Sequence, residues 1–375
     1  MSHQNIRLFS ADIGNDAMKG YAGEHHYYIP NVVAEIGDTR DYVELERNLL
    51  DGLHVEIESR ALSKGSTTCA VGNLAMQYQN NHELTQDSDK SSHDQPLVLL
   101  LTTLAVDALK HFPNQNGEVK AKYYLSTGLP LQEATQKGKK KAFKEKIAGF
   151  THVVTFKDTP EASGVRVILS FEDVLVNTEG HAAVFELTLD DHGKVKNENL
   201  TGVTLLIDDI GGLSTDAAII HANGSVDNVN SEGMREGVSP SLDEIMKRVE
   251  KEYRYMFKSR REVVEVLTNP LASEKGYIYV KGKKTSIQHI ADEILMRLAK
   301  REYHLLQQIW AKEGRIRFAF LIGGGSAILR PYLEQLNREG DDFPLRFVEA
   351  EDSIWMVSKA YFKILRLYLN QKKRG

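Results

Sequence analysis

The spacing of apolar residues along the chain changes between two periods. Runs with a period of two are typical of strands, and apolar residues that recur every three or four positions are typical of amphipathic helices. Strands are predicted over 6–13, 18–22, 27–33, 123–126, 165–171, 203–209, 217–220, 276–280, 318–322 and 345–348. Helices are predicted over 97–112, 137–147, 241–257, 285–310 and 353–370, with a helix-like segment in 172–185. Strands that alternate with helices, after an antiparallel hairpin in each half, predict an α/β fold of mixed sheets flanked by helices.

Length and charge narrow the class of protein. A chain of 375 residues exceeds the size at which one hydrophobic core keeps growing, so we expect two domains with a cleft between them. The net charge of −5 gives no general reason to bind nucleic acid or an anionic membrane. Three features favour a cytoplasmic protein without a membrane span. The chain has a single cysteine, Cys69, and its N-terminus does not resemble a secretory signal. Its longest apolar run, Leu97–Leu101, is too short to cross a bilayer.

One short motif occurs twice. An apolar run ends in Asp12–Ile13–Gly14 and turns into a second apolar run, and the same pattern recurs at Asp209–Ile210–Gly211. Subtracting 12 from 209 places the two aspartates 197 residues apart, which is about the length of one domain. The repetition predicts two related halves, each of which contributes one acidic hairpin.

These hairpins have the composition of a phosphate and metal site. Tight turns at Gly14–Asn15 and Gly211–Gly212 can present backbone N–H groups to phosphate oxygens. An aspartate at the end of a buried strand needs solvent, a partner or a cation, and Mg²⁺ is commonly held by one or two carboxylates together with substrate phosphates. An Asp-Gly turn alone also closes ordinary hairpins, so the repetition carries this hypothesis.

A glycine run, Gly323–Gly325, follows the predicted strand 318–322 and precedes Ser326. Contiguous glycines let the backbone approach a flat ring or a ribose closely, although they do not form a Rossmann fingerprint. The sequence contains no G-x-x-x-x-G-K-[ST] motif either. Together, the two hairpins and the glycine run predict a cleft that holds a nucleotide and its metal.

The order of these motifs resembles that of the actin superfamily. The first hairpin is followed by Thr127–Gly128–Leu129–Pro130–Leu131–Gln132–Glu133, then by the second hairpin and the glycine run. The sequence of residues 127–133 is most similar to that of the plasmid-segregating bacterial actins of the ParM kind. The resemblance covers nearly the whole chain. It implies two ribonuclease-H-like halves: domain I over 1–195 with an outer subdomain near 27–96, domain II over 196–345 with an outer subdomain near 235–285, and residues 346–375 returning to domain I.

The resemblance also implies roles for individual residues. The first phosphate segment would contain Gly14, Asn15 and Lys19, with Asp12 near the metal. Glu133 would position the attacking water, and Asp209 would be the second metal-side carboxylate. The second phosphate segment and the adenosine segment would consist of Gly211, Gly212, Ser214, Thr215, Gly323, Gly324, Gly325 and Ser326. Asp208, beside Asp209, departs from the family pattern.

The function implied is that of a Mg²⁺-dependent ATPase, with GTP as the alternative nucleotide, that polymerises head to tail on binding nucleotide and disassembles after hydrolysis. A ParM-like role further implies a DNA-binding adaptor protein, with no direct contact of this chain to DNA or membrane. Two alternatives stay open: a small-molecule kinase of the same fold, and a cell-shape or cell-division actin homologue.

Two polar segments have ordinary interpretations. Residues 77–95 contain few apolar side chains, which predicts a solvated loop. Six lysines between Lys137 and Lys146 follow the predicted catalytic segment, and they fit either a solvated helix face or a contact with a partner or a second subunit.

Overall fold

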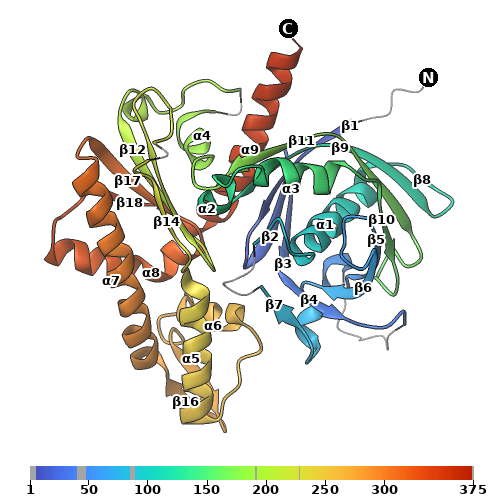
Figure 1. The fold of residues 1–375 in the computed structure, drawn as a ribbon. Coiled ribbons are helices and arrows are strands. Elements are labelled where there is room, and N and C mark those ends of the chain that lie inside the picture. The colour runs from blue at the N-terminus through green and yellow to red at the C-terminus, as the bar shows by residue number, and fades with distance from the viewer. Residues whose placement is uncertain (1–5, 40–47, 85–88, 191, 228, 374–375) are drawn as a thin grey trace. The chain divides into compact units, whose positions relative to one another are not determined.

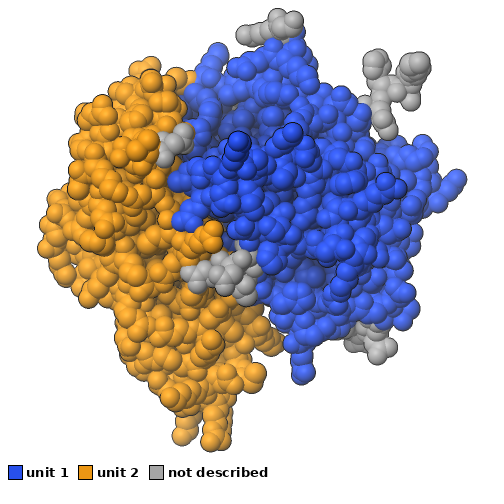
Figure 2. Space-filling view, viewed as in Figure 1, with its two compact units in different colours: residues 1–194, 355–375 blue, residues 195–354 orange. Residues whose placement is uncertain are grey.

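The computed structural model describes residues 6–39, 48–84, 89–190, 192–227 and 229–373. The chain divides into two compact units, drawn in different colours in Figure 2: residues 1–194 with 355–375 form unit 1, and residues 195–354 form unit 2. Each unit has its own sheet and its own hydrophobic core. The mixed sheets with flanking helices confirm the predicted α/β class (Figure 1).

Unit 1 is built on a sheet of eleven strands among the described residues, with the order β3-β2-β1-β9-β11-β10-β5-β6-β4-β7 and with β8 paired to β9. The strands are β1 (Ile6–Ile13), β2 (Ala17–Ala22), β3 (His25–Pro30), β4 (Val32–Glu35), β5 (His54–Glu58), β6 (Ser66–Val71), β7 (His82–Glu83), β8 (Asn114–Gln115), β9 (Glu118–Leu129), β10 (His152–Phe156) and β11 (Arg166–Thr178). The strands β1, β9 and β11 are parallel neighbours at its centre. Their carboxyl ends therefore meet at one edge, which is where open α/β sheets commonly bind ligands.

Helices cover both faces of this central region. They are α1 (Gln95–His111), α2 (Leu131–Ala134), α3 (Lys139–Ala148), α4 (Ala183–Thr188) and α9 (Ala350–Lys372), of which α9 joins unit 1 from Trp355. The Phe9 ring lies against Gly20 on the face covered by Thr103 of α1. On the opposite face, Ser10 Oγ donates a hydrogen bond to the carbonyl oxygen of Ser358 in α9, 2.7 Å away. The alternation along β1 thus assigns one helix to each face.

The apolar sequence of α1 explains its position. Thirteen consecutive residues from Pro96 to Ala108 are buried, and Pro96 lies in the first turn, where its missing N–H removes no helical hydrogen bond. A helix that is apolar on all sides must be enclosed by other elements. It is the central helix of the unit 1 core.

Unit 2 contains a smaller mixed sheet with the order β14-β13-β12-β17-β18, and a separate hairpin of β15 and β16. The strands are β12 (Thr204–Ile210), β13 (Thr215–Ile220), β14 (Glu232–Met234), β15 (Tyr277–Val280), β16 (Lys283–Ser286), β17 (Ile316–Ile322) and β18 (Leu345–Phe347). The helices are α5 (Val238–Tyr253), α6 (Arg260–Leu267), α7 (Gln288–Lys312) and α8 (Gly324–Glu339). Leu206, Ala217 and Leu321 project from the sheet into one core with the apolar residues of α5, α7 and α8.

Some predicted elements differ from the structure. The helix-like segment 172–185 was wrong in its first half, because β11 continues to Thr178 beside β9 with a register shift between Phe171 and Asp173 that interrupts the alternation. The strand at 345–348 pairs with β17 in unit 2, although we expected it to return to the first domain. The polar segment 77–95 contains the short strand β7 and the buried Lys90, and residues 85–88 lie outside the described part of the chain.

Within the described residues, no helix combines the length and the apolar character that crossing a bilayer requires.

Candidate functional site: two nucleotide-binding half-sites

The first hairpin places Asp12 at the carboxyl end of β1. Asp12 is 7% exposed, and its Oδ2 atom accepts a hydrogen bond from Lys19 Nζ of β2 at 3.2 Å. Strand pairing sets this contact, because Asp12 and Lys19 are direct cross-strand partners. The predicted residues Asp12 and Lys19 are therefore adjacent.

The ion pair stabilises the charged form of Lys19. Burial alone would lower the pKa of Lys19, but the negative charge of Asp12, with smaller contributions from Tyr28 and Asp16, raises it above its ordinary value. Lys19 is thus a permanent cation at the strand end, which is the property that a phosphate ligand requires.

The turn between β1 and β2 requires glycine. A Cβ atom on Gly14 would lie 2.8 Å from the carbonyl oxygen of Ala17, which is too close for any other residue. Asn31 holds the turn from outside, since its Nδ2 donates to the carbonyl of Gly14 at 2.8 Å and its backbone N–H donates to the carbonyl of Asp16 at 2.9 Å. Asn15, in this turn, is half-buried.

Glu133 lies beyond the carboxyl end of the neighbouring strand β9. Pro130 ends the strand and precedes the single turn of α2, in which Glu133 is 4% exposed. Its carboxylate accepts backbone N–H groups from Ser91 at 2.9 Å and from Lys90 at 3.1 Å. Glu133 is therefore a buried, oriented carboxylate and does not face solvent as an ordinary helix-start glutamate would.

Two further residues at this edge were missed by the sequence analysis. Glu179 follows the last residue of β11, is 8% exposed, and accepts a hydrogen bond from Lys90 Nζ at 2.6 Å. The only available signal was a glutamate and a glycine directly after a strand that is parallel to β9. Lys90 gave none, because it lies in a polar segment that resembles a solvated loop.

In unit 2, the turn between β12 and β13 packs against the start of α5. The N–H of Gly211 donates to the carbonyl of Ser214 at 2.9 Å and closes the turn. The first N–H groups of α5, from Val238 and Ser239, donate to the carbonyls of Gly211 and Gly212. Since these helix N–H groups would otherwise lack partners, the contact fixes both the helix and the turn.

The glycine run lies against the second Asp-Ile-Gly motif. Gly323 has a φ of +84°, and a Cβ atom there would lie 2.5 Å from Asp209 Oδ1 and 2.5 Å from the carbonyl oxygen of Ile210. A Cβ atom on Gly325 would lie 2.6 Å from the side chain of Ile210. The glycine run and the second Asp-Ile-Gly motif, which are more than a hundred residues apart in the sequence, therefore lie side by side in the structure. A nucleotide that contacts both segments requires this proximity.

The glycines also begin a helix. Gly324 is the first residue of α8 and is exposed, whereas the Oγ of the buried Ser326 donates to the carbonyl of Gly323 at 2.9 Å. The N–H of Gly323 donates to Ser353 Oγ at 2.8 Å. This arrangement presents backbone, without side chains, at the N-terminus of a sixteen-residue helix.

Thr215, by contrast, points into the helix-covered core. It is fully buried, and its hydroxyl donates to Glu302 Oε1 of α7 at 2.7 Å.

Asp208 is also fully buried, and its two oxygens have no hydrogen-bond partner among the described residues. Burial, followed by the charges of Glu302, Asp209 and Asp216, raises the pKa of Asp208 well above its ordinary value. The raised pKa means that burial favours the neutral form of this carboxyl group over the charged form.

The lysine-rich helix α3 is largely bound to its own chain. Lys140 donates to Thr178 Oγ1 at 2.7 Å, and Lys144 donates to Asp173 Oδ1 at 2.6 Å. Lys139 pairs with Asp89 at 3.1 Å, and Lys146 donates to the carbonyl of His93 at 2.9 Å. This helix therefore anchors the segment that holds Glu133, a role that neither interpretation of the lysine run anticipated.

One further group could hold a metal ion within the described residues: His221, Asp227 and Glu313. It lies where β13 ends and shortly before β17 begins, at the opposite end of these strands from Gly211 and Gly323. Two hydrogen bonds from the Arg315 guanidinium, together with its backbone N–H, lower the pKa of Glu313 to about 2. Glu313 thus already has a cationic partner.

Two family models match this chain. The family model "Actin like proteins N terminal domain" matches residues 10–180, and the model "Alp7A C-terminal domain" matches residues 204–343. Both Asp-Ile-Gly motifs, the segment 127–133 and the glycine run lie within the matched ranges. No curated protein matches the sequence.

Solved structures with the same fold cover almost the whole chain. ParM of Bacillus thuringiensis with ADP is 22% identical, with a TM-score of 0.72 over 98% of this chain and all of that one. The actin-like protein Alp7A is 18% identical, with a TM-score of 0.78 over 99% and 98% of the two chains. ParM from a 15-stranded filament of Clostridium botulinum is 17% identical, with a TM-score of 0.72 over 97% and 100%.

Proposed function

Because the chain belongs to the actin-like proteins, we propose that it is an ATPase that assembles into filaments when it binds nucleotide and disassembles after hydrolysis, and that it serves plasmid DNA segregation. The related structures support this proposal through what they contain: one ParM was solved with ATP, ADP and AMPPNP, and another was solved as a filament.

The observation that carries the proposal is the buried and oriented carboxylate of Glu133 beside the strand end that bears Asp12. Phosphoryl transfer to water needs little covalent chemistry from the protein, so positioning and charge stabilisation dominate. Glu133 would orient the water and accept its proton, and its two N–H partners keep the carboxylate in one orientation.

Other residues would bind the nucleotide. Lys19 would place a positive charge on the phosphates, and the backbone of the turns at Gly14–Asn15 and Gly211–Gly212 would donate N–H groups to phosphate oxygens. Gly323, Gly324 and Gly325 would let adenosine approach the backbone, with Ser326 holding the start of α8. Ser214 and Thr215 complete the second turn, Thr215 through its contact with Glu302.

A metal ion belongs to this proposal. Asp12 and Asp209 are oxygen ligands at strand ends, and such hard donors suit Mg²⁺, which would neutralise phosphate charge when bound. Convergence of the two aspartates from different units on one ion stays a prediction. We also propose that the nucleotide is ATP and not GTP, and that the partner is a DNA-binding adaptor protein.

Hydrolysis can control assembly with a small free-energy difference. A head-to-tail contact between identical subunits does not close, so it extends into a filament. A nucleotide-linked change of about 1.4 kcal/mol in the contact alters its affinity tenfold. ATP would therefore favour the polymer and ADP the free subunits.

The test combines light scattering with phosphate release. Wild-type protein with ATP and magnesium should scatter strongly and then lose scattering as phosphate appears. Glu133→Ala should assemble with ATP, release phosphate at least a hundredfold more slowly, and keep its polymer. Absence of an ATP-dependent polymer at every accessible concentration would refute the filament function and direct attention to phosphorylation of small molecules.

A further inference from the structure

The segment Asp89–His93 crosses the edge of unit 1 where the parallel strands end. Within it, Lys90 is 3% exposed, which is rare for a lysine unless it is paired. Its Nζ donates to Glu179 Oε1 at 2.6 Å, and the side chains of both residues are at most 10% exposed. This pair is therefore a buried ion pair, in which either partner alone would be costly to keep.

The same segment fixes Glu133. The backbone N–H groups of Lys90 and Ser91 donate to the two oxygens of Glu133, at 3.1 Å and 2.9 Å. One residue, Lys90, thus anchors the segment through its side chain and orients Glu133 through its backbone. The two glutamates follow neighbouring parallel strands, β9 and β11.

The charges of this edge are interdependent. Burial raises the pKa of Glu179, Lys90 partly counteracts this, and the charges of Asp12 and Glu133 raise the pKa further. The carboxylates of Asp12 and Glu133, which follow or end the strands β1 and β9, therefore act electrostatically on Glu179 at the end of β11, and Lys90 is the cation hydrogen-bonded to Glu179. Removing that cation would leave mutually repelling carboxylates in a buried site.

We propose that Lys90 and Glu179 are positioning residues for nucleotide hydrolysis, which act by holding the backbone of residues 90–91 against the carboxylate of Glu133. The inference rests on the proposed function. It assigns a task to a buried ion pair that the nucleotide-binding motifs do not include. Because displacement of a reacting group by about 1 Å can reduce a rate a hundredfold, a loosened segment should reduce turnover without weakening nucleotide binding.

The first experiment measures steady-state ATP hydrolysis of the full chain. Lys90→Met should lower kcat at least tenfold and change KM less than threefold, and Lys90→Arg should restore most of the rate because it retains the ion pair. Lys141→Met is the matched control, since the Lys141 side chain is 81% exposed and lies in the adjacent helix α3. A folded Lys90→Met protein with kcat within twofold of wild type would overturn the inference, as would a raised KM with unchanged kcat.

A second variant keeps the test decisive if Lys90→Met fails to fold. The double change Lys90→Met and Glu179→Gln removes both charges, so no buried charge loses its partner. It should fold, bind a fluorescent ATP analogue with an affinity within threefold of wild type, and show the same loss of kcat. Wild-type turnover in this folded double variant would overturn the inference.

Amide hydrogen exchange gives a readout that does not require activity. The N–H groups of Lys90 and Ser91 should exchange at least tenfold faster in Lys90→Met than in wild type, and Lys141→Met should leave them unchanged. Unchanged exchange in Lys90→Met would contradict the anchoring role, even if the protein hydrolysed no nucleotide. If wild-type protein hydrolyses no nucleotide but Lys90→Met still exchanges these two amides at least tenfold faster than wild type, the proposed function is refuted and the anchoring role of Lys90 is retained.

Discussion

At the scale of single residues, the candidate site depends on a few glycines whose missing Cβ atoms leave space for neighbouring backbone. Gly323 is the strongest example, because it combines a left-handed φ of +84° with a close approach to Asp209 and Ile210. Only glycine satisfies both conditions without strain. The same backbone conformation occurs at Gly224, with a φ of +81°, but there a Cβ atom would meet nothing within 4 Å.

This difference provides a matched pair of variants. Gly224→Ala should lose about 1 kcal/mol of unfolding free energy, from the backbone conformation alone. Gly323→Ala adds a steric conflict, so we expect a loss at least 2 kcal/mol larger, together with weaker nucleotide binding. Urea denaturation of both variants measures the difference. Equal losses would show that Gly323 is not packed against the Asp209 strand end.

Lys19 allows a second prediction at this scale. Lys19→Met removes the partner of Asp12 and the proposed phosphate contact. Hydrogen bonds to charged groups contribute about 1.5–3 kcal/mol, so the affinity for a fluorescent ATP analogue should fall by at least tenfold. Lys64→Met is the control, because the Lys64 side chain is 76% exposed in a surface ion pair. Unchanged affinity in Lys19→Met would exclude Lys19 from the phosphate site.

At the scale of elements, the hairpins and long helices could be predicted from the sequence because their periodicity is strong. The two Asp-Ile-Gly hairpins and α1, α5 and α7 lie within a few residues of the predicted ranges. The strands β5, β6 and β10 were missed because such short strands carry little periodicity, and helix α6 was missed because it has only eight residues.

The candidate site residues came from two sources in the sequence. The glycine turns were chosen because they follow apolar strands directly, whereas Glu133 was chosen from the resemblance of residues 127–133 to the actin superfamily. The sequence could not identify Lys90 or Glu302, whose importance comes from burial against elements far away in the chain. Nor could it show that Thr215 points into the core, since the side of a strand that faces the helices is decided by packing.

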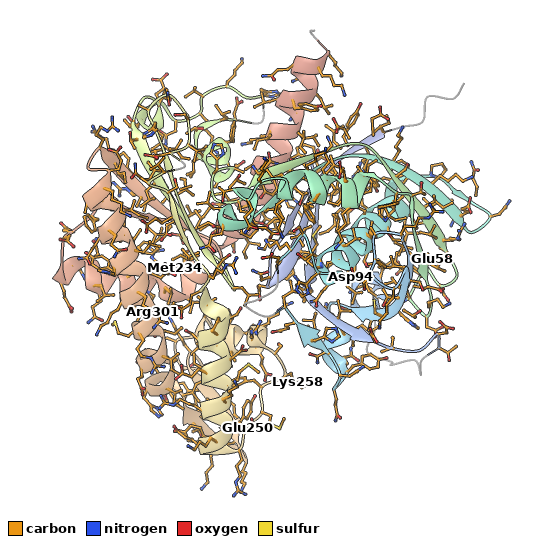
Figure 3. The ribbon with its side chains drawn as sticks, viewed as in Figure 1. Glu58, Asp94, Met234, Glu250, Lys258 and Arg301 are labelled. Atoms are coloured by element: carbon orange, nitrogen blue, oxygen red, sulfur yellow. The ribbon has the colours of Figure 1, made fainter. Side chains whose placement is uncertain are left out.

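Helix α3 leads to a prediction at the element scale. Lys146 donates hydrogen bonds to carbonyls of the segment 91–93 and lies 3.8 Å from Asp94, a residue labelled in Figure 3. Lys146→Met should therefore raise hydrogen exchange and proteolytic cleavage in residues 89–94 several-fold. Lys141→Met should not, because the exposed Lys141 side chain pairs with Glu145 of its own helix, with 3.7 Å between Nζ and Oε1. Equal exchange in the two variants would contradict the anchoring role of α3.

At the scale of the whole molecule, two buried acids in unit 2 make stability depend on pH. Burial, partly offset by the hydrogen bond from Thr215, raises the pKa of Glu302 to about 7, and the pKa of Asp208 is also raised. The folded chain then binds protons more tightly than the unfolded chain. The stability contributed by Glu302 is complete below its unfolded pKa of 4.5 and is lost as pH rises through about 7.

Thermal unfolding of Glu302→Gln tests this dependence. The Gln side chain can still accept the Thr215 hydroxyl but cannot ionise, so the decline in melting temperature of unit 2 between pH 5 and 8 should become shallower. The variant should be more stable than wild type at pH 8, by roughly 1–3 kcal/mol. Identical pH profiles for the two proteins would show that folding does not raise the pKa of Glu302.

For the whole molecule, we propose that nucleotide binds both Asp-Ile-Gly hairpins and drives head-to-tail assembly. Electron cryomicroscopy of the purified chain with ATP and magnesium is the decisive measurement. We expect filaments whose subunits contain nucleotide density between the strand end of Asp12 and the turn of Gly211–Gly212, and single subunits when ADP replaces ATP. Single subunits with ATP at every concentration, or filaments whose nucleotide lies away from both aspartates, would contradict this proposal.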